Sequence, residues 1–139
     1  MIEIETYRGV VYPWHCDFNE HMNVQHYVGK FDEATWHFFG HLTITASFLR
    51  KNKKGLVAVE QHLTYYKELL AGDLIVIKTQ LLELKPKSIT FLHKMYNSEN
   101  EELAAQGKMT GVYIDKTTRK SDLLPDFVFK KARTLQKSK

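Results

Sequence analysis

The sequence predicts an α+β domain in which a curved sheet of about five antiparallel strands wraps around one long helix. Two patterns carry this prediction. Residues 24–40 repeat apolar side chains at three- and four-residue steps, which is typical of a helix with one buried face. Residues 56–115 instead alternate apolar and polar side chains or are rich in β-forming residue types. The turns between these later runs are short, so we expect an antiparallel meander, and we expect all 139 residues to form one domain.

The N-terminal part is expected to hold the first strand and the long helix. The strand is expected over residues 2–12, with an irregularity near Gly9. The helix is expected to begin after Asn23, a preferred N-cap residue, and to end at Gly40, a residue type that often follows the last turn. Its expected apolar face consists of Val24, Tyr27, Val28, Phe31, Ala34, Thr35 and Phe38.

The remaining elements are placed by the same periodicities and by turn residues. They are a short helix over 42–49, a polar turn over 51–55, strands over 56–69, 74–84, 89–96 and 103–115, and a C-terminal amphipathic helix over 126–135. A sheet of this size has exposed edges, which are often covered by pairing with a second copy of the chain.

The composition is that of a globular protein, with 43% hydrophobic and 26% charged residues. No apolar run approaches the roughly 20 residues of a membrane span, and no signal peptide opens the chain, so no membrane association is expected. The only cysteine, Cys16, excludes an internal disulfide and fits a cytoplasmic location. The net charge of +4 suggests an anionic partner such as a phosphorylated cofactor. The aromatic–basic pattern of RNA-binding modules is absent, so no nucleic acid partner is expected.

A polar loop over residues 14–23 precedes the long helix and holds the densest set of reactive side chains: His15, Cys16, Asp17, Asn19, Glu20, His21 and Asn23. The unpaired N–H groups and the positive dipole end of a helix N-terminus favour a carbonyl oxygen or an anion. The loop is therefore the candidate site of chemistry on such a group.

Several roles are open for the loop residues when they are considered alone. Asp17 is either a nucleophile or general base, or a residue that only caps a turn. Cys16 with His15 is a less favoured nucleophile, because neighbours in an extended segment point to opposite faces. A zinc site is disfavoured because the spacing fits no compact HxxxH or CxxC motif. Glu60, in a later strand, either faces solvent or reaches the site as a second carboxylate.

The order of motifs resembles that of the hotdog-fold acyl-CoA thioesterases of the hydroxybenzoyl-CoA thioesterase type. The loop and helix supply Asp17-x-Asn19-x-His21-Met22-Asn23-x-x-x-Tyr27, then Phe31-Asp32-x-Ala34. Later matches are Tyr65-x-Lys67-x-x-x-x-Gly72-Asp73 and Val112-Tyr113-Ile114-Asp115-x-x-Thr118-Arg119-Lys120, with Leu124-Pro125 after them. Two positions depart from the family: Glu20 stands where many members have Gly, and Val24 where many have a second Asn.

This resemblance implies a hotdog fold and hydrolysis of acyl-coenzyme A or, in some members, acyl-carrier-protein thioesters. Coenzyme A enters as part of the substrate, and neither a metal nor a prosthetic group is used. Two subunits are expected to join into one continuous sheet with the active sites at their interface, and such homodimers often pair into homotetramers.

The resemblance also assigns residues. Asp17 matches the catalytic aspartate and His21 the loop histidine, and the backbone over 23–25 would polarise the thioester oxygen. Further candidates for substrate contact are Asn19, Asn23, Val24, Tyr27 and Glu60. Basic residues that flank turns, Lys85, Lys87, Arg119 and Lys120, are candidates for binding the phosphates of coenzyme A.

Two other functions compete with hydrolysis on the same fold. One is a non-catalytic acyl-CoA-binding or interaction protein, in which the loop is only structural. The other is an acyl-thioester dehydratase or hydratase, whose own motif is absent from this sequence. A fold alone would not decide among them.

Overall fold

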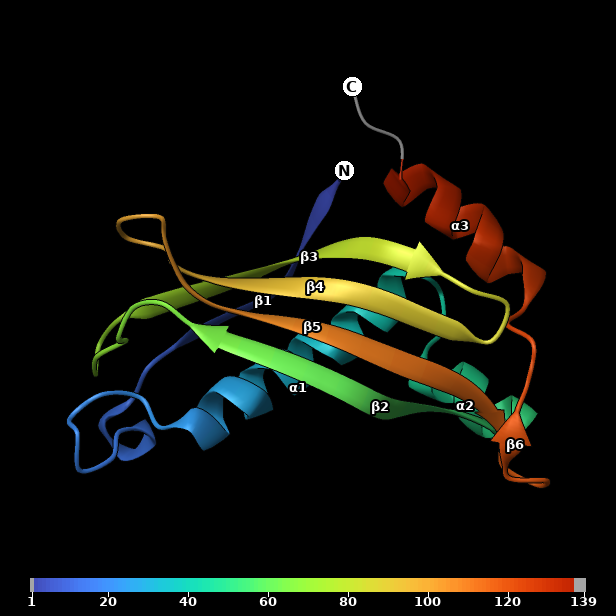
Figure 1. Cartoon of the computed structure of the whole chain (residues 1–139), viewed down its shortest axis with the longest axis horizontal. Coiled ribbons are helices and arrows are strands. Elements are labelled where there is room, and N and C mark those ends of the chain that lie inside the picture. The colour runs from blue at the N-terminus through green and yellow to red at the C-terminus, as the bar shows by residue number, and fades with distance from the viewer. Residues whose placement is uncertain (1, 137–139) are drawn as a thin grey trace.

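The computed structural model describes residues 2–136 as one curved sheet with a long helix against one face and shorter helices near its ends (Figure 1). The strands are β1 (Glu3–Val10), β2 (Lys54–Tyr65), β3 (Leu74–Leu84), β4 (Ser88–Asn97), β5 (Glu102–Asp115) and β6 (Lys120–Ser121). The helices are the short η1 (Pro13–His15), then α1 (Val24–His41), α2 (Ala46–Asn52) and α3 (Asp126–Gln136).

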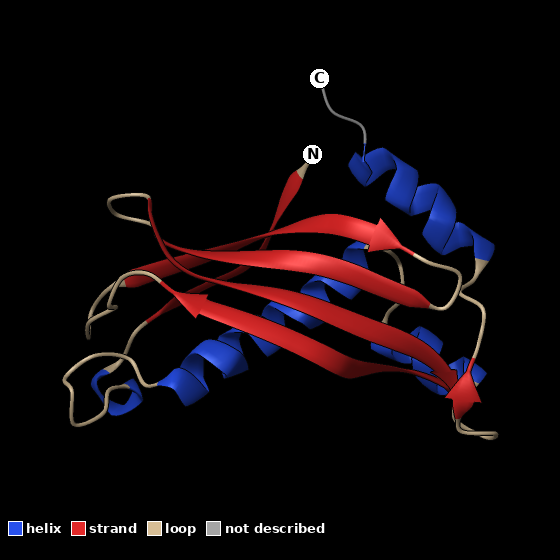
Figure 2. Cartoon of the chain, viewed as in Figure 1, coloured by secondary structure: helices blue, strands red, loops and turns tan. Residues whose placement is uncertain are grey.

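The sheet is antiparallel, with the strand order β1-β3-β4-β5-β2 and the two-residue β6 paired to the end of β5. It curves around α1, while α3 lies past the arrow end of β3 (Figure 2), where its Phe127 packs against Phe48 of α2 with ring centroids 5.3 Å apart. The face of the sheet toward α1 is core. Strand β4 shows this, because its residues alternate between buried ones (Ile89, Phe91, His93 and Met95) and half-buried ones. The predicted α+β arrangement of a curved antiparallel sheet, a long central helix and a C-terminal helix is confirmed.

Helix α1 fills the concave side of the sheet with its large apolar side chains. Phe31 and Phe38 are fully buried, and Phe38 packs against Phe91 of β4 with ring centroids 5.1 Å apart. Burial of one such side chain stabilises a fold by roughly 1.5–3 kcal/mol. The helix is therefore held along most of its length, and its N-terminus is fixed relative to the loop before it.

A buried chain of polar side chains also ties α1 to the sheet. His93 of β4 lies between the hydroxyl of Thr79 on its Nδ1 side (2.7 Å) and the hydroxyl of Thr35 of α1 on its Nε2 side (2.8 Å). Thr79 continues the chain to the hydroxyl of Thr6 at 2.8 Å. Burial lowers the pKa of His93 to about 3, so the ring stays neutral at ordinary pH.

The meander prediction is wrong for β2. Only β3, β4 and β5 follow one another in the sheet, whereas β2 pairs with β5 and leaves β3 to pair with β1. Burial gives the reason: three consecutive residues of β3, Ile75, Val76 and Ile77, are buried, which requires cover on both faces and partners on both sides. Most of β2 is exposed, which suits a strand at the edge of the sheet.

Three predicted details of the N-terminal half are also wrong. The strand irregularity falls at Thr6, where the register with β3 shifts, and not near Gly9. Helix α1 continues through Gly40, and Thr43, with a φ of 66°, is the left-handed residue after it. The predicted turn over 51–55 is divided between the end of α2 and the start of β2. Strand β2 itself stops at Tyr65 and does not extend to the predicted residue 69. No helix within residues 2–136 combines the length and the apolar character needed to cross a membrane.

Candidate active site

The polar loop before α1 is a closed turn with defined backbone bonds. The N–H of Asp17 donates to the carbonyl oxygen of His21 at 3.1 Å, and Cys16 and Met22 form an isolated antiparallel bridge. The N–H of Met22 donates to the carbonyl oxygen of Leu69 at 2.8 Å, which anchors the loop to the segment after β2. The loop is thus a rigid support for its side chains.

Glu20 occupies the strained position of this turn. Its φ of 68° lies in the left-handed region, which costs most residues with a side chain roughly 1–2 kcal/mol. Its N–H donates to the carbonyl oxygen of Asp17 at 2.9 Å, so the turn closes without a glycine. The departure from the glycine of many family members therefore keeps the turn and adds an exposed carboxylate to it.

The carboxylate of Asp17 is held by neutral donors. Oδ1 accepts from the backbone N–H of Asn19 and Oδ2 from the side-chain amide of Asn23, both at 2.8 Å. The Asn23 amide and, after it, the Asn19 N–H hold the pKa of Asp17 below its usual range. Asp17 is therefore a fixed, ionised carboxylate at neutral pH, and Asn19 and Asn23 position it.

One free donor marks the N-terminus of α1. The N–H of Asn23 donates to the carbonyl oxygen of His15, and that of Gln25 to the Asn23 side-chain oxygen, both at 2.9 Å. Among the described residues, the N–H of Val24 has no such acceptor. Of the three backbone donors expected over 23–25, Val24 alone is available to a substrate oxygen.

His21 and Tyr27 lie near this point with different surroundings. Nε2 of His21 is 3.7 Å from a carboxylate oxygen of Glu68, and an electrostatic interaction with His21 is a minor cause of the lowered pKa of Asp17. Tyr27 is buried and packs edge to face with Tyr65 at 5.0 Å. Burial raises the pKa of Tyr27 to about 12, so its hydroxyl stays protonated.

The thiol and imidazole beside Asp17 are engaged with the backbone. Nδ1 of His15 accepts from the Tyr12 N–H at 3.0 Å, and Sγ of Cys16 contacts the Tyr12 carbonyl oxygen at 3.9 Å. Because both side chains contact the backbone of Tyr12, Cys16 and His15 are not arranged as a nucleophile and its base. Nowhere in residues 2–136 do three His, Cys, Asp or Glu side chains gather as a metal site would require.

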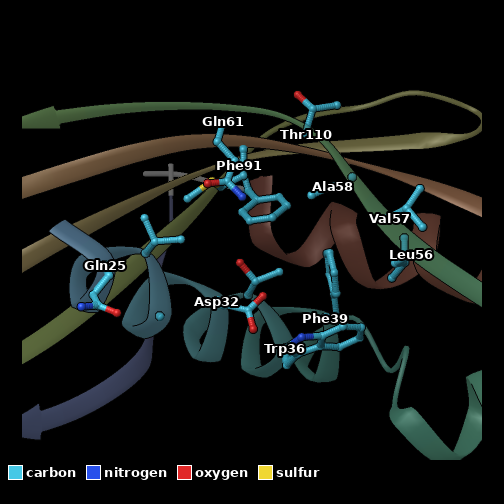
Figure 3. A pocket seen from close by; sticks show the side chains of 15 residues that line it. Gln25, Asp32, Trp36, Phe39, Leu56, Val57, Ala58, Gln61, Phe91 and Thr110 are labelled. Carbon is cyan, nitrogen blue, oxygen red and sulfur yellow. The ribbon is translucent and has the colours of Figure 1, made fainter.

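A cavity of about 400 Å³ lies between α1 and β2 (Figure 3). One wall comes from α1, and the other comes from β2 with parts of β4 and β5. It is lined by Gln25, Val28, Gly29, Asp32, Thr35, Trp36, Phe39, Leu56, Val57, Ala58, Gln61, Phe91, Met109, Thr110 and Gly111.

Sequence reasoning missed this cavity. The available signal was Trp36, a large apolar residue outside the predicted core face of the helix, which is 43% exposed. Glu60 is exposed and does not line the cavity, because a bulge between Ala58 and Glu60 shifts the alternation of β2 and places Gln61 there instead.

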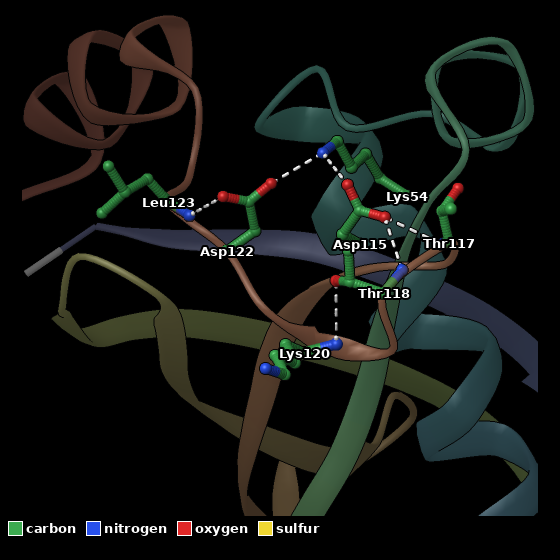
Figure 4. Close-up of polar contacts among 7 residues, drawn as sticks. All are labelled: Lys54, Asp115, Thr117, Thr118, Lys120, Asp122 and Leu123. Carbon is green, nitrogen blue, oxygen red and sulfur yellow. Dashed lines mark hydrogen bonds and ion pairs between the residues drawn. The ribbon is translucent and has the colours of Figure 1, made fainter.

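The basic candidates do not meet the loop within one chain. Lys85 and Lys87 lie in the β3–β4 turn, and Arg119 and Lys120 lie at the β5–β6 turn. Both turns are at the end of the sheet opposite the polar loop (Figure 1). Lys54 at this end pairs with Asp115 and with Asp122, which fixes the start of β2 to the segment after β5 (Figure 4).

Comparison with known families decides how this arrangement is classified. The sequence profile of the Thioesterase-like superfamily matches residues 11–132. The chain belongs to the thioesterase-like superfamily. This confirms the resemblance to the thioesterases at the level of the superfamily.

Related proteins share both sequence and fold with this superfamily member. L-carnitine dehydrogenase/betainyl-CoA thioesterase of Ruegeria pomeroyi is 29% identical over 113 residues, which are 81% of this chain but only 22% of that protein. A Staphylococcus aureus protein solved in complex with CoA has a TM-score of 0.89 at 21% identity, over 99% of this chain and 89% of that one. A gentisyl-coenzyme A thioesterase has a TM-score of 0.80 at 25% identity, over 91% and 98% of the two chains. The hotdog fold is confirmed by these likenesses.

Proposed function

We propose that the protein hydrolyses acyl-CoA thioesters to a free acid and coenzyme A, with Asp17 as the catalytic carboxylate. The observation that carries the proposal is the placement of Asp17, an ionised side chain fixed by neutral donors, one of which is Asn23, the residue directly before the free N–H of Val24. A negative oxygen and a backbone donor at a helix N-terminus are the two groups that attack on a thioester carbonyl needs.

The chemistry has two forms on these residues. Either an oxygen of Asp17 attacks the carbonyl carbon and the C–S bond breaks, giving a mixed anhydride that water cleaves. Or Asp17 takes a proton from a water molecule as that water attacks, and the C–S bond then breaks. In both forms the thiolate of coenzyme A leaves and ends as the thiol, the oxyanion accepts from Val24, and His21 orients the attacking water.

The remaining substrate contacts follow from the same placement. Asn19 and Asn23 orient Asp17, while Tyr27 is buried next to Tyr65 and supports the helix behind the loop. No metal or separate cofactor takes part, since coenzyme A arrives as part of the substrate. The reaction takes place in the cytoplasm, where the thiol of Cys16 stays reduced.

The complete site is formed in a homodimer, which pairs further in a tetramer if the outer faces also associate. The outer edge of β2 is free in the chain, and Val57 and Val59 on it are 40% and 58% exposed. Two-fold pairing of this edge with its copy is antiparallel, which sets the end of β2 near the loop against the beginning of the partner's β2. The cavity of one chain then faces Asp17 of the other.

The same pairing gives the basic residues a role. It carries the β3–β4 and β5–β6 turns of one subunit toward the loop of its partner. Lys85, Lys87, Arg119 and Lys120 can then meet the phosphates of coenzyme A at the entrance. In a single chain they lie at the wrong end of the sheet for this contact.

The acyl group belongs to the proposal as well. The related proteins named above include thioesterases for betainyl-CoA and gentisyl-CoA, whose acyl groups are small and polar. A cavity of about 400 Å³ has room for acyl groups of this size.

The test is release of free thiol from a panel of acyl-CoA esters by the parent protein and by Asp17→Asn. The exchange keeps side-chain size and removes the charge, so kcat should fall by roughly 10²-fold or more. A folded Asp17→Asn protein as active as the parent would refute the catalytic role. A parent that binds the esters without releasing thiol would instead support the non-catalytic acyl-CoA-binding function.

A further inference from the structure

The cavity between α1 and β2 contains one charged side chain, Asp32, that has no salt-bridge partner among residues 2–136. Asp32 is the only charged residue in its lining. No lysine, arginine or histidine nitrogen of residues 2–136 lies within 4.0 Å of its carboxylate. The nearby hydroxyl of Thr35 is already engaged, since it donates to the carbonyl oxygen of Phe31 and contacts Nε2 of His93. Asp32 is also exposed, so its carboxylate is open to a positive group that enters the cavity from outside the chain.

Most of the remaining lining is apolar or aromatic, which favours a cation with an apolar surface. Trp36 lies one helical turn after Asp32 on the same side of α1, and Figure 3 shows the two side by side, with Phe91 across the cavity. Trp36 packs edge to face with Phe39 at 5.7 Å, which steadies its ring. An aromatic face beside a carboxylate attracts a cation within about 6 Å of the ring.

The balance of polar and apolar side chains in the lining bears on the type of cation. A primary ammonium has three N–H donors, all of which need acceptors when they leave water. The uncharged acceptors of the lining are the side chains of Gln25, Gln61, Thr35 and Thr110, and the larger part of the lining is apolar, with side chains such as Leu56, Val57 and Met109. A quaternary ammonium has no N–H donor, and its methyl groups pack against aromatic and aliphatic surface.

We propose that this cavity binds the trimethylammonium end of an acyl group, with Asp32 supplying the opposite charge and Trp36 the aromatic face. The inference rests on the proposed thioesterase function and names its substrate class: CoA thioesters of short, permanently cationic acids. Asp32 and Trp36 then decide specificity, while Asp17 performs the chemistry.

The experiment compares pairs of CoA esters with the same shape and different charge. Trimethylammonioacetyl-CoA is paired with 3,3-dimethylbutanoyl-CoA, and 4-trimethylammoniobutanoyl-CoA with 5,5-dimethylhexanoyl-CoA. In each pair a carbon replaces the charged nitrogen. The parent should prefer the cationic ester of at least one pair by about tenfold or more in kcat/KM.

Three variants assign this preference to residues. Asp32→Asn and Trp36→Leu should each remove most of the preference, through a loss on the cationic ester and little change on its neutral partner. Glu33→Gln is the matched control, because Glu33 is the neighbouring exposed carboxylate on α1 and does not line the cavity. It should keep the preference of the parent.

The outcomes separate this inference from the proposed function. Hydrolysis of the neutral esters as fast as the cationic ones would overturn the cation site and leave the thioesterase proposal standing. An equal loss on both esters in Asp32→Asn would also overturn it, since the carboxylate would then serve the fold or pair with a basic residue of a second copy. A parent that hydrolyses no acyl-CoA ester at all would refute both proposals.

Discussion

The two ends of the sheet both carry aspartates with lowered pKa values, yet their surroundings differ in kind. At one end, Asp17 is held by an amide group and a backbone N–H, and no cationic nitrogen of the described chain pairs with it. At the other end, Asp115 and Asp122 share the ammonium group of Lys54 at 2.9 and 2.6 Å (Figure 4). Side-chain hydrogen bonds are the main cause of the lowered pKa in all three aspartates.

This difference teaches that a lowered pKa alone does not identify a reactive carboxylate. A carboxylate paired with lysine is partly neutralised and tied to its partner, which suits a structural link. A carboxylate whose hydrogen bonds come from neutral donors is fixed in place without a cation paired to it, so its charge remains available for attack or proton transfer. The end with the reactive carboxylate lacks the basic turns, and the end with the basic turns lacks the reactive carboxylate.

The largest expected effect comes from making the same substitution at both ends. Asp17→Asn should lower kcat for thioester hydrolysis by roughly 10²-fold or more, because the catalytic oxygen loses its charge. Asp115→Asn should keep kcat within a few-fold of the parent and lower the thermal midpoint, because it weakens the pairing with Lys54. Thiol release and thermal denaturation of both variants check this. Equal losses of activity would show that the two carboxylates are alike in function.

The cavity offers the next largest effect. Adding a Cβ at Gly29 meets nothing within 4 Å, and Gly29 lines the cavity, so Gly29→Phe should fold and fill the space for the acyl group. We expect kcat/KM to fall by about tenfold or more, on the scale of a blocked pocket contact. Gly40→Phe is the matched control, since it adds the same ring to open space on the same helix, outside the cavity. If both variants lose activity alike, the cavity is not the acyl site.

A smaller effect is expected in the pH dependence. The amide of Asn23 is the first cause of the lowered pKa of Asp17, and its oxygen caps α1 by accepting from Gln25. Asn23→Ser keeps a capping oxygen and removes the amide donor, so the pKa of Asp17 should rise toward its usual 3.8. The acid limb of kcat/KM should move to higher pH, with little change at neutral pH where Asp17 stays ionised. An acid limb that does not move would mean that it reports another group.

The smallest effect concerns stability at the opposite end. Lys54→Met leaves two carboxylates facing each other, so the free energy of unfolding at neutral pH should decrease. In the parent the pKa values of Asp115 and Asp122 lie below their usual 3.8, so their stabilising contribution is present above that pH and is lost as the pH falls through the lowered values. The stabilities of parent and variant should therefore converge in acid. Thermal denaturation between about pH 3 and 7 measures this, and a gap that persists in acid would contradict it.

The fold was largely predictable because its signals are local. The 3.6-residue repeat of α1, the alternation of β4 and the cap at Asn23 each act over a few residues. The place of β2 was not predictable, because pairing with β5 instead of β3 depends on which strand has both faces covered. The left-handed turn at Thr43 was missed because Gly40 carried the usual signal for a helix end.

The candidate site divides in the same way. The loop motif around Asp17 lies within ten residues of sequence, and its mutual contacts follow from that closeness. The cavity joins α1 to β2, β4 and β5, so its lining depends on tertiary packing that no local pattern encodes. The residues of a second copy that would complete the cavity depend on the interface between two chains, which local sequence patterns predict even less well.

The most direct test of the central claim, that each site combines the two ends of different chains, is complementation between two inactive subunits. Asp17→Asn and Gly29→Phe chains carrying different tags are co-expressed, and the mixed dimer is purified through both tags. If Asp17 of one chain works on the cavity of the other, the mixed dimer has one intact site of two and about half the kcat of the parent dimer. A mixed dimer no more active than the two separate variants would contradict the account and place each site within a single chain.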